Sequence, residues 1–114
     1  MPTDKTIDFH EALIKQMVEE MRPPVHIRNE LDIGYSFESN ILELFEIRPR
    51  WDKKDKLIHS KFAKSRFIKS QGIWRIYWMR ASGKWELYDP NPEVKDIHSF
   101  FVIVKEDKHS CFLG

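Results

Sequence analysis

The stretch LDIGYSFESNILELFEIR (residues 31–48) decides the fold, because apolar residues recur at every second position on both sides of a short polar turn. Alternation with a period of two is typical of strands that bury one face. We predict a strand over residues 25–37, a turn at residues 38–40 and a returning strand over residues 41–48. The segment therefore forms a β-hairpin.

A three-residue loop predicts the register of this hairpin. It places Phe37 opposite Ile41, which brings the apolar faces of the two strands together, whereas a slip of one residue would mix the faces. On the other face the same register sets Asp32 opposite Glu46, with Arg48 two residues beyond Glu46. Two carboxylates and a cation are therefore expected side by side.

A helix is predicted before the hairpin, over residues 8–22. Asp8 is placed to cap it, and Pro23-Pro24 ends it because proline lacks the N–H that a helix needs. Its apolar residues recur at helical spacing and predict a buried stripe. The stripe consists of Phe9, Leu13, Met17 and Met21, with Ala12 and Val18 beside it.

The chain after the hairpin is basic and then forms a second hairpin. We predict a short helix over residues 60–70, ended by Gly72, and strands over residues 73–80 and 84–88 around a turn at Ser82-Gly83. The apolar face of the second hairpin is expected to carry Trp74, Ile76, Trp78, Trp85 and Leu87.

A last helix begins after Asp96, which is placed to cap it, and the tail over residues 107–114 is expected to be mobile, although Phe112 and Leu113 are able to dock. The buried residues predicted for this helix are Ile97, Phe100, Phe101 and Val104. These elements predict an α+β fold in a single domain over residues 1–114, with helices on a largely antiparallel sheet.

The composition is that of a globular protein. The chain has 114 residues, of which 41% are hydrophobic, and its one cysteine, Cys111, excludes an intramolecular disulfide. No apolar run is long enough to span a membrane, and the N-terminus lacks the pattern of a signal peptide. We expect a soluble cytoplasmic protein with no membrane partner.

The net charge of +1 hides a strong segregation. Residues 1–47 carry 4 Lys and Arg against 10 Asp and Glu, residues 48–80 carry 11 against 2, and residues 81–114 carry 4 against 6. Clustered cations neutralise phosphates and bind nucleic acids without sequence preference, and an exposed tryptophan can stack on a base. We therefore expect a non-enzymatic domain that binds nucleic acid or another polyanion. The expected binding residues are Arg48, Arg50, Trp51, Lys53, Lys54, Lys56, Lys61, Lys64, Arg66, Lys69 and Arg75.

Five motifs support a family resemblance: RPPVHIR (22–28), LDIGY (31–35), FEIRPRW (45–51), WRIYWMR (74–80) and CFLG (111–114). Together they resemble the small bacterial proteins grouped as domain of unknown function 3024. The resemblance covers nearly the whole chain from residue 22 onward. It implies a stand-alone bacterial domain and carries no established activity.

Two alternatives remain open. The first rests on Asp32, Glu46 and Arg48, whose spacing resembles the restriction-endonuclease-like superfamily, in which an aspartate precedes a Glu-x-Lys motif on the next strand. That resemblance implies Asp32 and Glu46 as ligands of Mg²⁺ and Arg48 in the place of the lysine, where arginine stabilises charge but is no base. The second alternative is self-association as a homodimer, in which acidic and basic segments of two copies meet. If the protein is not a nuclease, we expect it to bind neither a metal ion nor a cofactor.

Overall fold

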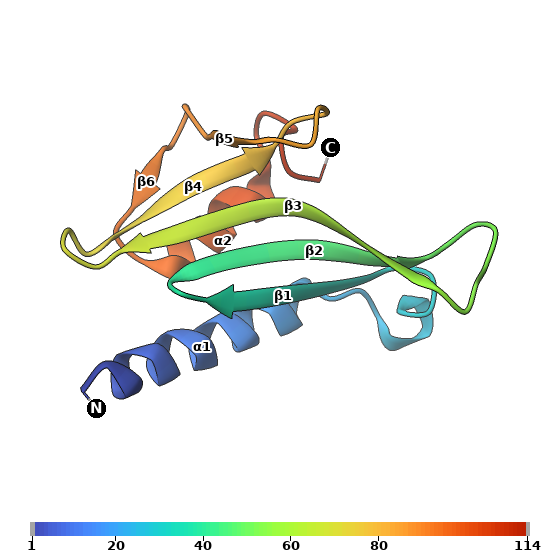
Figure 1. The fold of residues 1–114 in the computed structure, drawn as a ribbon, viewed down its shortest axis with the longest axis horizontal. Coiled ribbons are helices and arrows are strands. Elements are labelled where there is room, and N and C mark those ends of the chain that lie inside the picture. Colours follow the sequence, from blue (N-terminus) through green and yellow to red (C-terminus); the bar gives the residue numbers. More distant parts are fainter. Residues whose placement is uncertain (1, 114) are drawn as a thin grey trace.

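The computed structural model describes the backbone of residues 2–113 and the side chains of residues 9–113. This part of the chain forms two helices, one short 3₁₀ turn and a six-stranded sheet (Figure 1). In chain order the elements are α1 (Pro2–Met21), η1 (Val25–Ile27), β1 (Asp32–Glu38), β2 (Ile41–Pro49), β3 (Leu57–Ile68), β4 (Ile73–Met79), β5 (Trp85–Leu87), β6 (Glu93–Val94) and α2 (Ile97–Glu106). No helix among these is long and apolar enough to cross a membrane.

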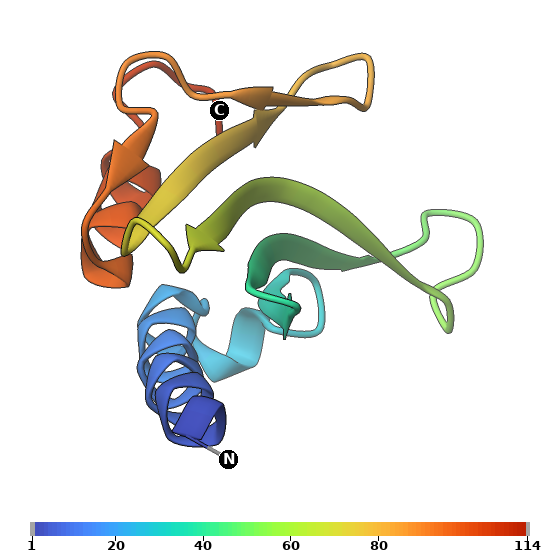
Figure 2. The ribbon, with the colours of Figure 1, turned by 60° about the vertical axis from the view of Figure 1, so that its left-hand side comes forward.

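Each strand of the sheet runs antiparallel to its neighbours. The order is β1-β2-β3-β4, and β5 and β6 both lie along the outer edge of β4. Helix α1 packs along β1, while α2 packs behind β4 and β6 and touches α1. Figure 2 shows that the far end of the β2–β3 ribbon reaches away from both helices. The predicted α+β class is confirmed.

The two faces of the sheet differ sharply in burial. The helical face carries Leu42, Leu44, Ala63, Ser65, Trp74 and Ile76, each of which is at most 2% exposed. Neither helix of the described residues covers the opposite face, which we call the open face. By strand register its side chains include Ile41, Glu43, Phe45, Ile47, His59, Lys61, Lys64, Arg66, Ile73, Arg75, Tyr77 and Trp85. Along β1–β4 the open face is therefore the broad side of the sheet that a ligand can reach, and at the far end of the β2–β3 ribbon residues of the other face, such as Arg48, are exposed as well.

Helix α1 is confirmed, although its first turns differ from the prediction. It begins at Pro2, so the backbone of Asp8 lies inside the helix rather than at its cap, and the side chain of Asp8 lies outside the described ones. Met17 and Val18 are buried as predicted, but Ile14 is fully buried while Phe9 is 67% exposed. The buried stripe is therefore rotated from the predicted one.

The register of the first hairpin differs by one residue from the prediction. The strand predicted over residues 25–37 starts only at Asp32, because η1 and a turn occupy the preceding residues. Ser39 and Asn40 both have positive φ angles, of 52° and 65°, which gives a two-residue turn of the kind that matches strand twist. Glu38 consequently pairs with Ile41, and Phe37 pairs with Leu42 rather than with Ile41.

The predicted short basic helix over residues 60–70 is wrong, because this segment belongs to β3. It pairs with β2 on one side and with β4 on the other. A β-bulge inserts Phe62 between the residues that face Leu44 and Phe45 of β2. Phe62 and Ala63 are both buried as a result, although they are adjacent in sequence. Gly72, with a φ of 63°, lies in the turn between β3 and β4.

The C-terminal half follows the prediction more closely. The second hairpin forms, but Trp85 and Leu87 pair with Met79 and Tyr77 and so lie on the open face rather than in the core. Helix α2 is capped by Asp96, whose carboxylate accepts a hydrogen bond from the Ser99 N–H at 2.8 Å, and it buries the four residues predicted for it. The C-terminal segment docks through Phe112, which is 6% exposed and packs against Tyr88 at a ring distance of 5.0 Å.

Candidate functional site

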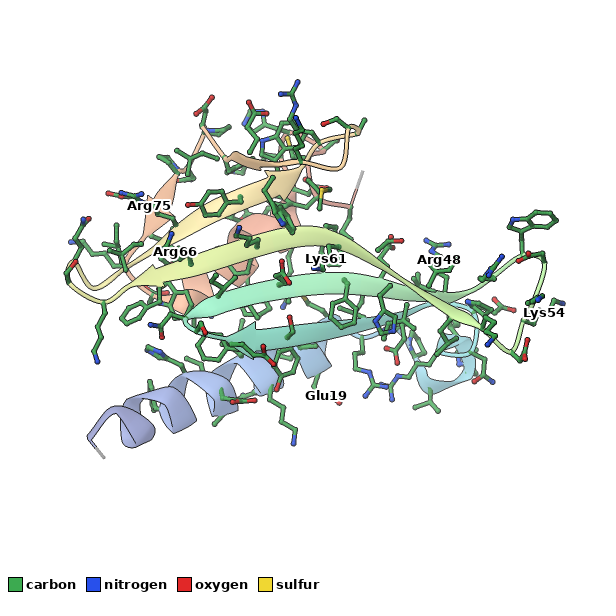
Figure 3. All side chains as sticks on the ribbon, viewed as in Figure 1. Glu19, Arg48, Lys54, Lys61, Arg66 and Arg75 are labelled. Carbon is green, nitrogen blue, oxygen red and sulfur yellow. The ribbon has the colours of Figure 1, made fainter. Side chains whose placement is uncertain are left out.

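The predicted cations extend along the long axis of the molecule. Figure 3 shows Arg75 on β4, Arg66 and Lys61 on β3, Arg48 on β2 and Lys54 in the loop over residues 50–56, in that order from one end to the other. Glu19 lies apart from them on α1. The basic middle of the sequence therefore becomes an elongated surface rather than one face of a helix.

Some of these cations are paired with carboxylates of the same chain. Arg48 lies 3.3 Å from Glu46, and Lys61 lies 3.1 Å from Glu43. Arg50 forms an ion pair with Asp52, two residues further along the loop, at 2.8 Å. Exposed ion pairs of this kind contribute at most about 1 kcal/mol and exchange readily for other anions. Internal neutralisation therefore accounts for only part of the basic surface.

Arg66 and Arg75 are the most unusual cations of the open face. They stand directly opposite each other on β3 and β4, both are exposed, and neither forms an ion pair with a carboxylate among the described side chains. Glu93 is the register partner of Arg75 on β6, yet the two make no ion pair either. Like charges directly opposite each other destabilise a sheet. The repulsion between Arg66 and Arg75 therefore destabilises this part of the sheet, and a bound anion would remove it.

Lys64 lies over two aromatic rings of the open face. Its ammonium is 4.8 Å from the ring centre of Tyr77 and 5.5 Å from that of Trp85. Tyr77 is the register partner of Lys64, and Trp85 follows from the next strand. Both rings are partly exposed. The cation shows that the ring faces, and not only their edges, are directed outward.

A second aromatic group lies towards the other end of the open face. The rings of Phe45 and His59 stack at 4.7 Å with an angle of 10° between their planes. Phe45 lies against Gly34, where a Cβ atom would come within 2.7 Å of the ring, so only glycine fits beneath it without displacing the ring. His59 is exposed above this stack. The imidazole thus rests on Phe45, which in turn lies against the backbone of Gly34 in the edge strand β1.

The loop over residues 50–56 closes the end of the β2–β3 ribbon. The Arg50 N–H donates to the Lys56 carbonyl at 2.8 Å, and the Lys56 N–H donates to the Lys53 carbonyl at 3.0 Å. Trp51 is 92% exposed, and the lysines of the loop, Lys53, Lys54 and Lys56, are exposed as well. Lys69 lies at the opposite end of β3, beyond its last residue. These predicted residues are brought to the surface but are not gathered into one pocket.

The predicted pairing of Asp32 with Glu46 is wrong. Asp32 pairs with Ile47, while Glu46 pairs with Ile33, so the two carboxylates point to opposite faces of the sheet. Arg48 follows Glu46 on its face. Among the described residues no group of three or more His, Cys, Asp and Glu side chains is placed to hold a metal ion. The geometry on which the nuclease interpretation rested is therefore not present.

Asp32 is instead held by the end of α1. Its two carboxylate oxygens accept hydrogen bonds from Nε and Nη2 of Arg22, at 2.9 and 2.8 Å, and Arg22 also contacts Glu19 at 2.7 Å. The hydrogen bonds from Arg22, with one from the Ile33 N–H, lower the pKa of Asp32 although partial burial opposes them. Asp32 is thus an anchor between the first helix and the edge strand.

This anchor predicts a pH dependence of stability. A carboxylate whose pKa is lowered by folding contributes stability above its ordinary pKa of about 3.9, and the contribution is lost as the pH falls through the lowered value. At neutral pH the free energy of unfolding should therefore be higher for the wild type than for Asp32→Asn. This difference should shrink as the pH falls into the acid range. Urea unfolding from neutral pH to about pH 2.5 measures it. A difference that stays constant with pH would contradict the prediction, and Asp89→Asn, which changes an exposed aspartate, is the control.

Three aromatic residues of the open face were missed from the sequence: His59, Tyr77 and Trp85. The alternation in β4 already sets Tyr77 on the same side as Arg75, which is a usable signal. The sequence predicts Trp85 on the core face, whereas its register partner in the structure is Met79, on the open face. Nothing in the sequence indicates that His59 stacks on Phe45, since β3 itself was not recognised.

Comparison with known proteins agrees with the motifs quoted above. Neither a curated protein nor a solved structure matches the chain. The family model described as Domain of unknown function (DUF3024) matches residues 2–114, which is essentially the whole chain. The chain therefore belongs to the DUF3024 family.

Proposed function

We propose that the protein is a non-enzymatic domain that binds nucleic acid through the open face of its sheet and the loop over residues 50–56. The observation that carries the proposal is the register pair of Arg66 and Arg75, two exposed guanidinium groups with no ion-pair partner among the described carboxylates. Guanidinium groups bind phosphate with two parallel hydrogen bonds. A phosphate between them would relieve their mutual repulsion.

The shape of the basic surface supports a long polyanion rather than a small one. The molecule measures 46 Å along its longest axis, and the labelled cations in Figure 3 follow that axis. A single small anion could contact only one end of this row. Nucleic acid presents phosphates at regular intervals and can reach several of the cations at once. A cytoplasmic location in a bacterium, as expected from the sequence, would give access to both DNA and RNA.

The alternatives have less support. The nuclease interpretation would need Asp32 and Glu46 on one face, and their register places them on two. Self-association would pair acidic and basic segments of two copies, but Glu43, the carboxylate that β2 carries on the open face, is already bound to Lys61.

Salt dependence tests the proposed function. Fluorescence anisotropy with labelled DNA and RNA oligonucleotides should give an affinity that falls linearly with the logarithm of the salt concentration, with a slope of about −0.7 to −0.9 per neutralised phosphate. Lys53→Ala/Lys54→Ala/Lys56→Ala should weaken binding to every sequence and make the slope shallower. The matched control, Lys95→Ala/Lys105→Ala/Lys108→Ala, removes three exposed lysines from the region of α2 and should change neither quantity.

Two results would overturn the proposal. One is the absence of binding to DNA and RNA even at low salt. The other is equal weakening by the two triple variants, because binding would then follow net charge rather than the open face and its loop. A mass that rises with protein concentration and falls with salt, measured by light scattering without nucleic acid, would favour self-association instead.

A further inference from the structure

We infer that the ligand is single-stranded, with unpaired bases stacked on the aromatic rings of the open face. This inference rests on the proposed function and deepens it by naming the form of nucleic acid. It is carried by two ring groups that the binding of phosphates does not require: Tyr77 with Trp85, and His59 on Phe45.

The first ring group offers its faces to the solvent side of the sheet. The Lys64 ammonium lies over Tyr77 and Trp85 at 4.8 and 5.5 Å, so that side of each ring is reached by a flexible side chain rather than by the core. Neither ring is part of the buried core cluster among the described residues. A base can take the place of the ammonium, since both are attracted to the ring face, and Lys64 can then turn to a phosphate.

The second ring group is rigid in a way that favours stacking. Phe45 is fixed between Gly34 beneath and His59 above, in a nearly parallel stack. An open groove of about 400 Å³ beside it is lined by Phe45, His59 and Tyr35, and on its far side by Lys15 and the ion-paired Glu19, Arg22 and Asp32. A base on the exposed imidazole would extend an existing stack at the mouth of this groove. Such a preformed stack loses little side-chain freedom on binding.

The cations of β3 are placed for the backbone of the same strand. Lys61 lies between the two ring groups, Lys64 lies over the first of them, and Arg66, which faces Arg75 on β4, lies beyond it. Phosphates could thus contact cations both between the two stacked bases and beyond the first ring group. A duplex hides its base faces by stacking and pairing, so it could use the cations but not the rings. Only an unpaired strand uses both.

Four probes of equal length test the inference: oligo(dT), oligo(U), an abasic phosphodiester chain and a duplex. The two single strands should bind on the order of 10-fold or more tightly than the abasic chain, since stacking adds affinity for each base. Binding of either single strand should quench tryptophan fluorescence, because Trp85 and the exposed Trp51 both lie on the proposed binding surface. Oligo(dT) and oligo(U) differ in the 2′-hydroxyl and in the thymine methyl group, so equal binding of both would show that stacking needs neither group.

Ring variants provide the second arm. Tyr77→Ala and His59→Ala should each lower the affinity for the single strands on the order of 10-fold and leave the affinity for the abasic chain unchanged. Tyr77→Phe, which keeps the ring, should bind the single strands as the wild type does. If the side chain had only a structural role, Tyr77→Ala would also lower the affinity for the abasic chain. Equal affinity for all four probes would overturn this inference and leave the proposed function intact. Binding to none of them would overturn both.

Discussion

Replacing Arg66 with glutamate should weaken nucleic-acid binding and stabilise the fold at the same time. The affinity at low salt should fall on the order of 100-fold, because one charge-assisted hydrogen-bonding group is lost and a repulsive carboxylate takes its place. The free energy of unfolding should rise by about 0.5 kcal/mol, since the like-charged pair with Arg75 becomes an opposite-charged one. Anisotropy titration and urea unfolding of the same sample measure the two effects.

The opposite signs make this prediction discriminating. A residue that only maintains the sheet would lower stability and binding together when it is replaced. Lys95→Glu makes the same change of charge at an exposed position just before α2 and should alter neither quantity strongly. If Arg66→Glu destabilised the protein as well, the pairing of Arg66 with Arg75 would be structural, and the main support for a phosphate site would be gone.

The helices and the second hairpin could be predicted from sequence because their signals are local. Helix α2 has a capping aspartate and apolar residues at helical spacing, and both features depend only on neighbouring residues. The turn at Gly83, which has a φ of 86°, likewise indicates the second hairpin. Local signals thus predict where these elements lie, whereas the buried stripe of α1 and the register of the second hairpin depend on tertiary packing and differ from the prediction.

Strand β3 could not be predicted because its sequence pattern is broken by the bulge. With Phe62 as an extra residue, two adjacent residues are buried and the alternation of a strand is lost, so the segment resembles a short amphipathic helix. Its lysines, alanine and arginine are also good helix formers. Pairing with β2 and β4 on both sides overrides that preference. Because β3 forms the centre of the open face, a helix predicted over these residues leaves the open face unpredicted.

In the candidate site, too, some features depend only on the local sequence and others depend on how the strands pair. Exposure of the basic residues followed from their charge alone, whereas their neighbours depended on register. A turn of two residues instead of three moved Asp32 away from Glu46 and removed the apparent metal site. The bulge and the register of the second hairpin together bring His59 and Trp85 to the face that carries Arg66 and Arg75, whereas Tyr77 shares the side of Arg75 by simple alternation along β4. Single-residue shifts of this kind reverse which side chains meet, and no local signal records them.

Trp74→Ala should be the most destabilising single substitution of those considered. Trp74 is 2% exposed and lies at the centre of an aromatic cluster, with ring distances of 4.9 Å to Phe67, 5.2 Å to His10 and 6.1 Å to Phe37. Truncating a buried tryptophan costs about 3–5 kcal/mol, because packing is lost and a cavity remains. For a chain of this size the melting temperature should fall by roughly 12–20 °C, as followed by circular dichroism.

Trp51→Ala is the matched control, since it removes the same side chain from a position that is 92% exposed, and it should leave the melting temperature unchanged. The comparison also separates the two sides of β4. Trp74 and Ile76 anchor this strand in the core, while Arg75 and Tyr77 face outward from it, so the core substitution should loosen the open face as well. Equal melting temperatures for the two variants would mean that β4 is not fixed by its tryptophan, and the open face would then lack the rigid support that stacking of bases requires.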